Sequence, residues 1–426
     1  MSQPTRTASI MWEHSHREFL PNLRLMRRLM ERDVTPSLSP LKRGGVREAT
    51  SPDVVTIPFY YDPVDLETYL YGHRGRPTSF INLSYEQMHF ACGRGYILPD
   101  GEFAQRHMLH CAWGPRYFNH LVRHGVPAEN IRVTGHPRFD LYAKDTLSEA
   151  MALSREELAG AFGLDPHKPW LLIPYNFNMA YLTPKQVQAL VSRRYALTPE
   201  FIEGFARAKD RFTAFNDALC GALDGVEVIL RVHPAGYESE EIYRALSARR
   251  PNLHLISAWD ISHWIKQAAG VMVWNSTTAM EALVAGVPVF SFEPEPLSER
   301  FDYDLNRIIT TVRAERDALD LISALARGDA ARVARDLEPN WELFEEWYQY
   351  RDGQSDQRLA AVVVEAAEGG AEIPWRRYTS PLKTTRAWWR ARKRLQRLTL
   401  LDRVSGESSR ELARTLDLTP LRDLLR

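Results

Sequence analysis

Residues 271–294 read VMVWNSTTAMEALVAGVPVFSFEP. An apolar run is followed by Asn275, Ser276, Thr277 and Thr278, then by the helix-favouring stretch AMEALVA and Gly286. A second apolar run begins directly after that glycine. A strand, a helix and a strand in so short a span predict a β-α-β unit of a parallel sheet. The polar residues before the helix predict either plain helix capping or an anion-binding turn at its N-terminus.

The same alternation extends over most of the chain. Further apolar runs in the same half lie at 170–175, 226–232 and 253–257. Earlier strand-like runs lie at 8–12, 53–59, 78–83, 108–113 and 131–135, and residues 35–52 read as a loop. Near-continuous apolar runs are typical of parallel strands that are buried on both faces. The pattern predicts an α/β protein with two Rossmann-like halves that face a central cleft.

The length of 426 residues accommodates two or three domains. We expect a first Rossmann-like domain over 1–160 and a second over 166–312. A helical segment over 313–370 is expected to close across both, and a basic amphipathic tail over 371–426 completes the helical C-terminal extension.

Composition excludes several classes of protein. The formal net charge is zero, so nothing in the overall balance favours nucleic acid. The three cysteines have no CxxC spacing, which argues against a disulfide framework and a cysteine zinc site and fits a reducing cytosol. No apolar run is long enough to cross a membrane, and the N-terminus has no apolar core typical of a signal peptide. P-loop and GxGxxG motifs are also absent from the sequence.

Two further strand ends carry polar side chains. LRVHP at 230–234 places Arg231 and His233 two residues apart, on one side of a strand, where they could bind a phosphate or could be structural. VTGHPRFDLY at 133–142 places Gly135, His136 and Arg138 at the rim of the expected cleft. Both stretches follow strands at the edge where open α/β sheets bind ligands.

Carboxylates are the candidate catalytic groups. Glu86 in FINLSYEQ follows a strand of the first half and could act as a general base, with a pKa raised by partial burial. Glu13 in WEHSHREF is the second candidate, and Glu18 is the third. Glu281 lies within the helix of the opening stretch, where it could reach a ribose hydroxyl.

The ordered set WEHSHREF, INLSYEQ, CAWG, VTGHPRFD, LRVHP and NSTTAMEALVAGVPVF resembles the surface carbohydrate biosynthesis proteins. These are GT-B glycosyltransferases, similar more distantly to capsule Kdo transferases, polysialyltransferases and CDP-glycerol glycerophosphotransferases. The resembling residues span about 10–300. The resemblance implies a GT-B fold and a nucleotide-activated donor bound in the second half.

By this resemblance, Arg231 and His233 contact the donor phosphate, and Asn275, Ser276 and Thr277 bind its oxygens. Glu281 matches the acid that binds the ribose. The His-Pro after a strand resembles CMP-sugar transferases, so a Kdo-like or sialic-acid-like CMP donor is favoured over a UDP donor. The family works without a metal or other cofactor, because cationic side chains and the helix stabilise the departing phosphate.

The expected function is transfer of that sugar to a glycan or lipid-linked glycan acceptor of a surface polysaccharide. The alternatives are a UDP-sugar 2-epimerase-like enzyme, a CDP-glycerol-type polyol-phosphate transferase, or a non-catalytic GT-B scaffold. The tail from Pro374 to Arg426 carries 14 Lys and Arg against five Asp and Glu, and apolar residues interleave its basic ones over 374–404. This pattern favours binding to an anionic membrane surface, with packing on the acidic body and RNA binding as alternatives. A cytoplasmic protein, peripheral at the inner face of the cell membrane, is therefore expected.

Overall fold

The structure is a computed structural model. It describes residues 6–41, 52–63, 65, 66, 69, 79–192, 195–232, 240–295, 297, 303–369, 373 and 378. The predicted basic tail therefore lies almost wholly outside the described residues, and so does His233.

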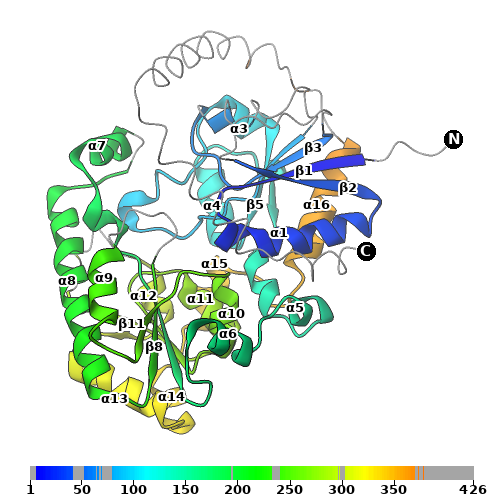
Figure 1. Cartoon of the computed structure of the whole chain (residues 1–426). Coiled ribbons are helices and arrows are strands. Elements are labelled where there is room, and N and C mark those ends of the chain that lie inside the picture. Colours follow the sequence, from blue (N-terminus) through cyan, green and yellow to red (C-terminus); the bar gives the residue numbers. More distant parts are fainter. Residues whose placement is uncertain are drawn as a thin grey trace, which may run out of the picture.

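Two six-stranded sheets form the centres of the two halves (Figure 1). The first has the order β2-β1-β3-β4-β5-β6 and the second β12-β11-β10-β7-β8-β9. The strands of the first are β1 (Arg6–Trp12), β2 (Val34–Pro40), β3 (Val54–Ile57), β4 (Ser79–Asn82), β5 (Met108–Ala112) and β6 (Ile131–Val133). Those of the second are β7 (Trp170–Pro174), β8 (Glu227–Arg231), β9 (Leu253–Leu255), β10 (Gly270–Val273), β11 (Val289–Phe292) and β12 (Thr311–Val312).

Each pair of neighbouring strands is parallel. Most central strands are buried along their whole length, which explains their near-continuous apolar sequences. The predicted α/β class with two Rossmann-like domains is confirmed.

Helices cover both sheets. In the first half they are α1 (Ser15–Met30), α3 (Glu102–His107) and α4 (Pro115–Arg123). From the connection onward they are α5 (Thr146–Ala150), α6 (Arg155–Phe162), α7 (Pro184–Ser192), α8 (Pro199–Ala222), α9 (Glu240–Ser247), α10 (Ile261–Gln267), α11 (Thr278–Val284), α12 (Leu305–Ile308), α13 (Glu315–Ala326), α14 (Ala330–Asp336), α15 (Trp341–Trp347) and α16 (Ser355–Gly369). Gly286 has a φ of +71°, as expected for the glycine that ends α11.

The expectation of a loop over 35–52 is wrong for its first part. Residues 34–40, VTPSLSP, form the edge strand β2, which pairs in parallel with all seven residues of β1. Pro36 and Pro40 made this stretch read as a loop, but an edge strand tolerates proline because one side of it needs no ladder hydrogen bonds.

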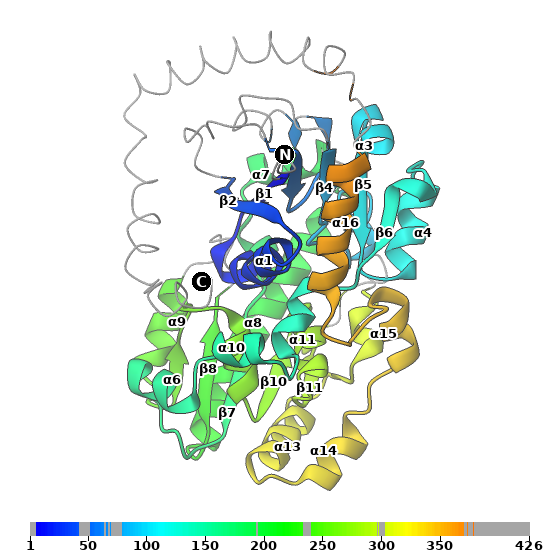
Figure 2. The same cartoon turned by 90° about the vertical axis from the view of Figure 1, so that its right-hand side faces the viewer.

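The chain returns to the first half at its C-terminal end. α16 packs beside α1 on the first sheet, as both views show (Figures 1 and 2). Leu359 and Val363 of α16 share a buried cluster with Leu25 and Leu29 of α1 and with Ile81 of β4. The segment 313–369 thus begins against β12 and ends on the opposite half. In the part of the chain that the structure describes, no helix is both long and apolar enough to cross a membrane.

Candidate functional site

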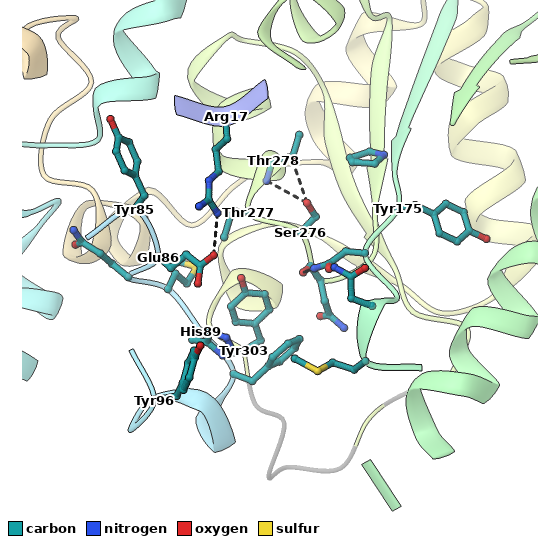
Figure 3. Close-up of a pocket in the computed structure, with 18 of the residues that line it drawn as sticks. Arg17, Tyr85, Glu86, His89, Tyr96, Tyr175, Ser276, Thr277, Thr278 and Tyr303 are labelled. Atoms are coloured by element: carbon teal, nitrogen blue, oxygen red, sulfur yellow. Dashed lines mark hydrogen bonds and ion pairs between the residues drawn. The ribbon is translucent and has the colours of Figure 1, made fainter. Parts of the chain in front are cut away.

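A cavity of about 540 Å³ lies between the two halves. Residues that follow strands of the first sheet form one wall, including Arg17, Glu86, His89, Trp113, His136 and Arg138. Residues of the second half form the other, including Asn176, Arg231, Asn275, Ser276, Thr277 and Glu281. Figure 3 shows Arg17 and Glu86 on one side of the cavity and Ser276 on the other. The cavity lies where open α/β sheets bind ligands, at the carboxyl ends of the strands.

The turn after β10 presents backbone and hydroxyl groups to the cavity. Asn275 has a φ of +50°, and its side-chain oxygen accepts a hydrogen bond from Asn306 Nδ2 at 2.9 Å. Its carbonyl accepts one from Asn176 Nδ2 at 3.0 Å. Ser276 Oγ donates to Thr278 Oγ1 at 3.1 Å and accepts a weak bond from the Thr278 N–H at 3.4 Å, whereas Thr277 is exposed and makes no side-chain cap. The hydrogen bonds from the side-chain amides of Asn176 and Asn306 hold Asn275 in its left-handed conformation. The turn is therefore a fixed part of the cavity wall.

Arg231 lines the cavity from the end of β8, and its guanidinium is held by backbone carbonyls. Nη1 donates to the Ala258 carbonyl and Nη2 to the Trp259 carbonyl, each at 2.7 Å. Burial lowers the pKa of Arg231 to about 10. No carboxylate forms an ion pair with Arg231 among the described residues, so its positive charge remains available to an anion. Its predicted neighbour His233 lies outside the described residues.

Arg138 and Glu281 lie together in an ion cluster that joins the halves. Arg138 donates to both oxygens of Asp260 at 3.0 and 2.9 Å, and to Glu281 Oε2 at 2.8 Å. The Tyr142 hydroxyl donates to the same Glu281 oxygen at 2.8 Å. Burial alone would lower the pKa of Arg138, but Asp260 and Glu281 raise it well above its usual value. The predicted ribose acid therefore also belongs to an interdomain contact.

The other two residues predicted at the cleft rim have different positions. Gly135 does not line the cavity; a Cβ on it would lie 2.6 Å from Ser355 Oγ, so this glycine lets α16 approach. His136 does line the cavity and stacks on Trp113, with ring centroids 3.9 Å apart. Burial lowers the pKa of His136 well below its usual range, and the cations Arg138 and Arg17 lower it further. Its imidazole is therefore neutral.

Glu86 is the carboxylate that the first wall presents to the cavity. Its side chain is 39% exposed. Oε1 accepts a hydrogen bond from Arg17 Nη1 at 2.9 Å, and Oε2 accepts one from the Tyr61 hydroxyl at 3.0 Å. Burial alone would raise the pKa of Glu86, but Arg17 lowers it to about 2. The expectation of a raised pKa is wrong, because Arg17 lies 69 residues away from Glu86 and no local pattern links the two.

The two other candidate bases do not line the cavity. The Glu13 N–H donates to Glu18 Oε2 at 2.7 Å, and the Glu13 carboxylate lies 3.4 Å from His14 Nε2. The Glu18 side chain is fully buried and accepts hydrogen bonds from Arg17. Of the three candidate bases, Glu86 alone lines this cavity.

Several residues of the site were not found from the sequence. Arg17 lies in WEHSHREF, but only the acidic residues of that stretch were singled out. Asp260 follows β9 and caps α10 by accepting from the Ser262 N–H at 2.8 Å. A helix-capping position is the one local sign of Asp260 in the sequence. The lining residues of 176–190, between β7 and α8, carry no motif. In the described ranges, no group of three or more His, Cys, Asp or Glu is placed to hold a metal ion.

No family model and no curated protein matches the chain. Solved structures do match it. The wall teichoic acid polymerase TagF superimposes with a TM-score of 0.56 at 10% identity, over 87% of this chain and 91% of that one. A TagF variant soaked with CDPG gives a TM-score of 0.54 at 12% identity, over 86% and 89% of the two chains. The S. aureus MnaA–UDP structure has a TM-score of 0.49 at 11% identity, over 85% and 97%.

The likeness to TagF establishes the class of protein by fold: this chain is a GT-B protein with two Rossmann-like domains around a cleft. At such low identity the likeness extends to the fold alone. The resemblance to the surface carbohydrate biosynthesis proteins remains a prediction from the motifs.

Proposed function

We propose that the protein is a transferase that moves a group from a nucleotide-activated donor to a hydroxyl of a surface-polysaccharide acceptor. One observation carries the proposal. One cavity is lined by Glu86 of the first half and by Arg231 and Ser276 of the second, and Figure 3 shows Glu86 and Ser276 on opposite sides of it. This layout holds a proton acceptor and a site for an anionic leaving group on opposite sides of one space.

The donor phosphate is proposed to lie on the second wall. A guanidinium has five N–H donors, and the two carbonyls that hold Arg231 occupy two of them. Asn275, Ser276 and Thr277 line the same cavity. Both hydrogen bonds to Glu281 go to Oε2, and Oε1 makes none within the described part of the chain, so it can accept from a ribose hydroxyl. His233 stays in the proposed donor set.

The proposed reaction uses no reactant besides the donor and the acceptor. The acceptor oxygen forms a bond to the transferred carbon of a sugar, or to the phosphorus of a polyol phosphate. The bond from that atom to the leaving phosphate oxygen breaks, and the nucleotide keeps the electron pair. Glu86 takes the proton of the acceptor hydroxyl, while Arg231 and the hydroxyls stabilise the charge on the leaving group. No metal ion takes part in the proposed reaction.

The donor is proposed to be a cytidine nucleotide, first a CMP-activated Kdo-like or sialic-acid-like sugar and second a CDP-polyol. LRVHP supports the first, and the fold likeness to a polymerase solved after a CDPG soak is compatible with the second. Activity assays with both donors, each with and without a glycan acceptor, separate these two. Turnover of a UDP-sugar without any acceptor would instead favour the epimerase alternative.

Calorimetry with CMP, CDP and UDP tests the donor site. Arg231→Gln is compared with Arg155→Gln, because Arg155 also donates to backbone carbonyls, of Pro166, Lys168 and Gln267, but does not line the cavity. We expect a cytidine nucleotide to bind the wild type and Arg155→Gln equally, and Arg231→Gln roughly 10-fold to 100-fold more weakly, as for loss of a charged hydrogen bond. Failure of all three nucleotides to bind would overturn the proposal in favour of a non-catalytic scaffold.

The basic segment 374–404 is proposed to attach the protein to the inner face of the cell membrane. Its interleaved Trp and Arg residues support this, at about 1 kcal/mol per basic residue near an anionic surface. Co-sedimentation with phosphatidylglycerol vesicles should be lost on removal of 374–426, and pure phosphatidylcholine vesicles are the control. Equal binding to both lipids would refute the electrostatic attachment.

A further inference from the structure

The guanidinium of Arg17, in the cavity wall, has N–H groups that no acceptor in the described part of the chain uses. Its Nε and Nη2 donate to Glu18 Oε1 at 3.1 and 2.8 Å, and its Nη1 donates to Glu86 Oε1 at 2.9 Å. These bonds use three of the five N–H groups of a guanidinium, so two remain. The side chain is 23% exposed and lines the cavity beside Glu86 (Figure 3). A planar guanidinium with two spare N–H groups suits the oxygens of a phosphate.

The neighbouring arginines make Arg17 the suitable cation of the first wall. Arg138, also from this half, pairs with Asp260 and Glu281 and is 3% exposed, whereas Arg17 pairs with Glu18 and Glu86 and is 23% exposed. Arg138 Nη1 additionally donates to the Arg17 carbonyl, which fixes the start of α1 against the ion cluster that joins the halves. Arg17 is thus held in place by its backbone, while the end of its side chain stays at the cavity surface.

The pKa of Glu86 depends on the positive charge of Arg17. The groups that face it from the packed elements are Arg17, Tyr61, His89, Tyr195 and Tyr303. The Tyr61 hydroxyl donates to it, and His89 is neutral because burial lowers its pKa, so Arg17 supplies the full positive charge. Arg17 pairs with both Glu18 and Glu86, and its charge makes Glu86 a poor proton acceptor.

We infer that Arg17 is a positioning residue shared between Glu86 and the donor phosphate, so that donor binding strengthens Glu86 as the acceptor of the hydroxyl proton. The inference rests on the proposed function. When a phosphate bound by Arg231 on the second wall also accepts from the spare N–H groups of Arg17 across the cavity, it compensates part of the positive charge of Arg17. Glu86 then becomes more basic only while a donor is present, which couples proton transfer to the presence of the group to be transferred.

The pH dependence of the rates tests this coupling. The acid limb of kcat/KM for the donor reports Glu86 in the free enzyme, and the acid limb of kcat at saturating donor reports it in the complex. In the wild type, we expect the acid limb of kcat to lie about one pH unit or more above the acid limb of kcat/KM. In Arg17→Gln the two limbs should coincide, whereas Arg17→Lys should restore part of the separation. Coincident limbs in the wild type would overturn the inference, and so would a separation unchanged in Arg17→Gln.

A second measurement does not need turnover. Pyrophosphate binding by calorimetry is compared for the wild type, Arg17→Gln and Arg27→Gln, a control on the same helix whose arginine pairs with Glu31 on the surface. We expect roughly 10-fold to 100-fold weaker binding in Arg17→Gln alone. Equal binding in all three proteins would refute the role of Arg17 even if transfer occurs. If Arg17→Gln loses pyrophosphate binding but the wild type transfers no group from any donor, the anion site at Arg17 stands and the proposed function is rejected.

Discussion

Arg138 and Arg231 line the same cavity and are both buried, yet their surroundings differ. Arg138 lies among the carboxylates of Asp260 and Glu281, which raise its pKa. Arg231 is held by two carbonyl dipoles, and burial lowers its pKa to about 10. The first arginine joins the halves, and the second has no carboxylate ion pair among the described residues, as the proposed anion site requires. Residue type and burial alone therefore do not reveal what an arginine in a cleft does.

The largest effect is expected from removing the compensated arginine. Arg138→Met should lower the free energy of unfolding by about 4–5 kcal/mol, because two buried carboxylates lose their cation. Urea unfolding followed by fluorescence measures this. The triple variant Arg138→Met, Asp260→Asn, Glu281→Gln should recover most of the loss; if it is no more stable than the single variant, lost packing and not unpaired charge is the cause.

A third buried arginine, Arg24, extends the comparison to a site where carboxylates are in excess. It pairs with Asp145 and Asp356, and Asp140 lies beside them, accepting from the Asp356 N–H at 2.6 Å. Burial and the neighbouring Asp356 raise the pKa of Asp140 to about 7. The folded state thus binds a proton that the unfolded chain releases above about pH 4, so this stabilisation is present below pH 4 and lost as pH rises to 7.

The unfolding free energy of the wild type, relative to Asp140→Asn, should therefore fall by about 3 kcal/mol between pH 4 and pH 7. Taking the difference between the two proteins removes the titration of groups they share. A difference that is constant across this range would show that Asp140 is ionised in the fold throughout.

A smaller stability effect is expected at the arginine held by carbonyls. Arg231→Gln should cost about 2 kcal/mol, since the Ala258 and Trp259 carbonyls lose donors but no buried charge is left unpaired. Thermal unfolding checks the value. A loss as large as that of Arg138→Met would remove the distinction between the two arginines and make Arg231 a structural residue first.

The smallest effect belongs to an arginine outside the cavity. Arg27 pairs with Glu31 across one turn of α1, and both side chains are about two-fifths exposed. Arg27→Gln should change the unfolding free energy by less than about 0.5 kcal/mol, as solvent-exposed pairs usually do. A larger change in the same urea experiment would mean that α1 is more sensitive than its contacts imply, and would weaken Arg27→Gln as a control for Arg17→Gln.

Prediction from the sequence worked where the signal is local. Apolar runs such as 170–175 and 271–274 identified the strands because burial on both faces leaves a continuous pattern along the chain. The same logic failed at 34–40, where prolines concealed an edge strand that exists through its pairing with β1. Two-residue β12 carried too little pattern to be predicted.

The site was predictable only in part for the same reason. Strand ends drew attention to Glu86, Arg231 and Ser276, and all three line the cavity. Their chemical states came from partners far along the chain: Arg17 lies 69 residues from Glu86, and Arg138 lies 122 residues from Asp260. Gly135 has a strand-end motif but faces α16, because the chain returns to the first half after position 350.

By itself, the sequence determined the α/β class, the two strand arrays and the polar residues at the strand ends, since these follow from hydrophobic periodicity and local capping. Only the tertiary structure decided which arginine is compensated by carboxylates, which keeps its charge, and how strongly Glu86 attracts a proton. Electrostatic energies depend on distances between groups in space, and those distances are set by the packing of the two halves.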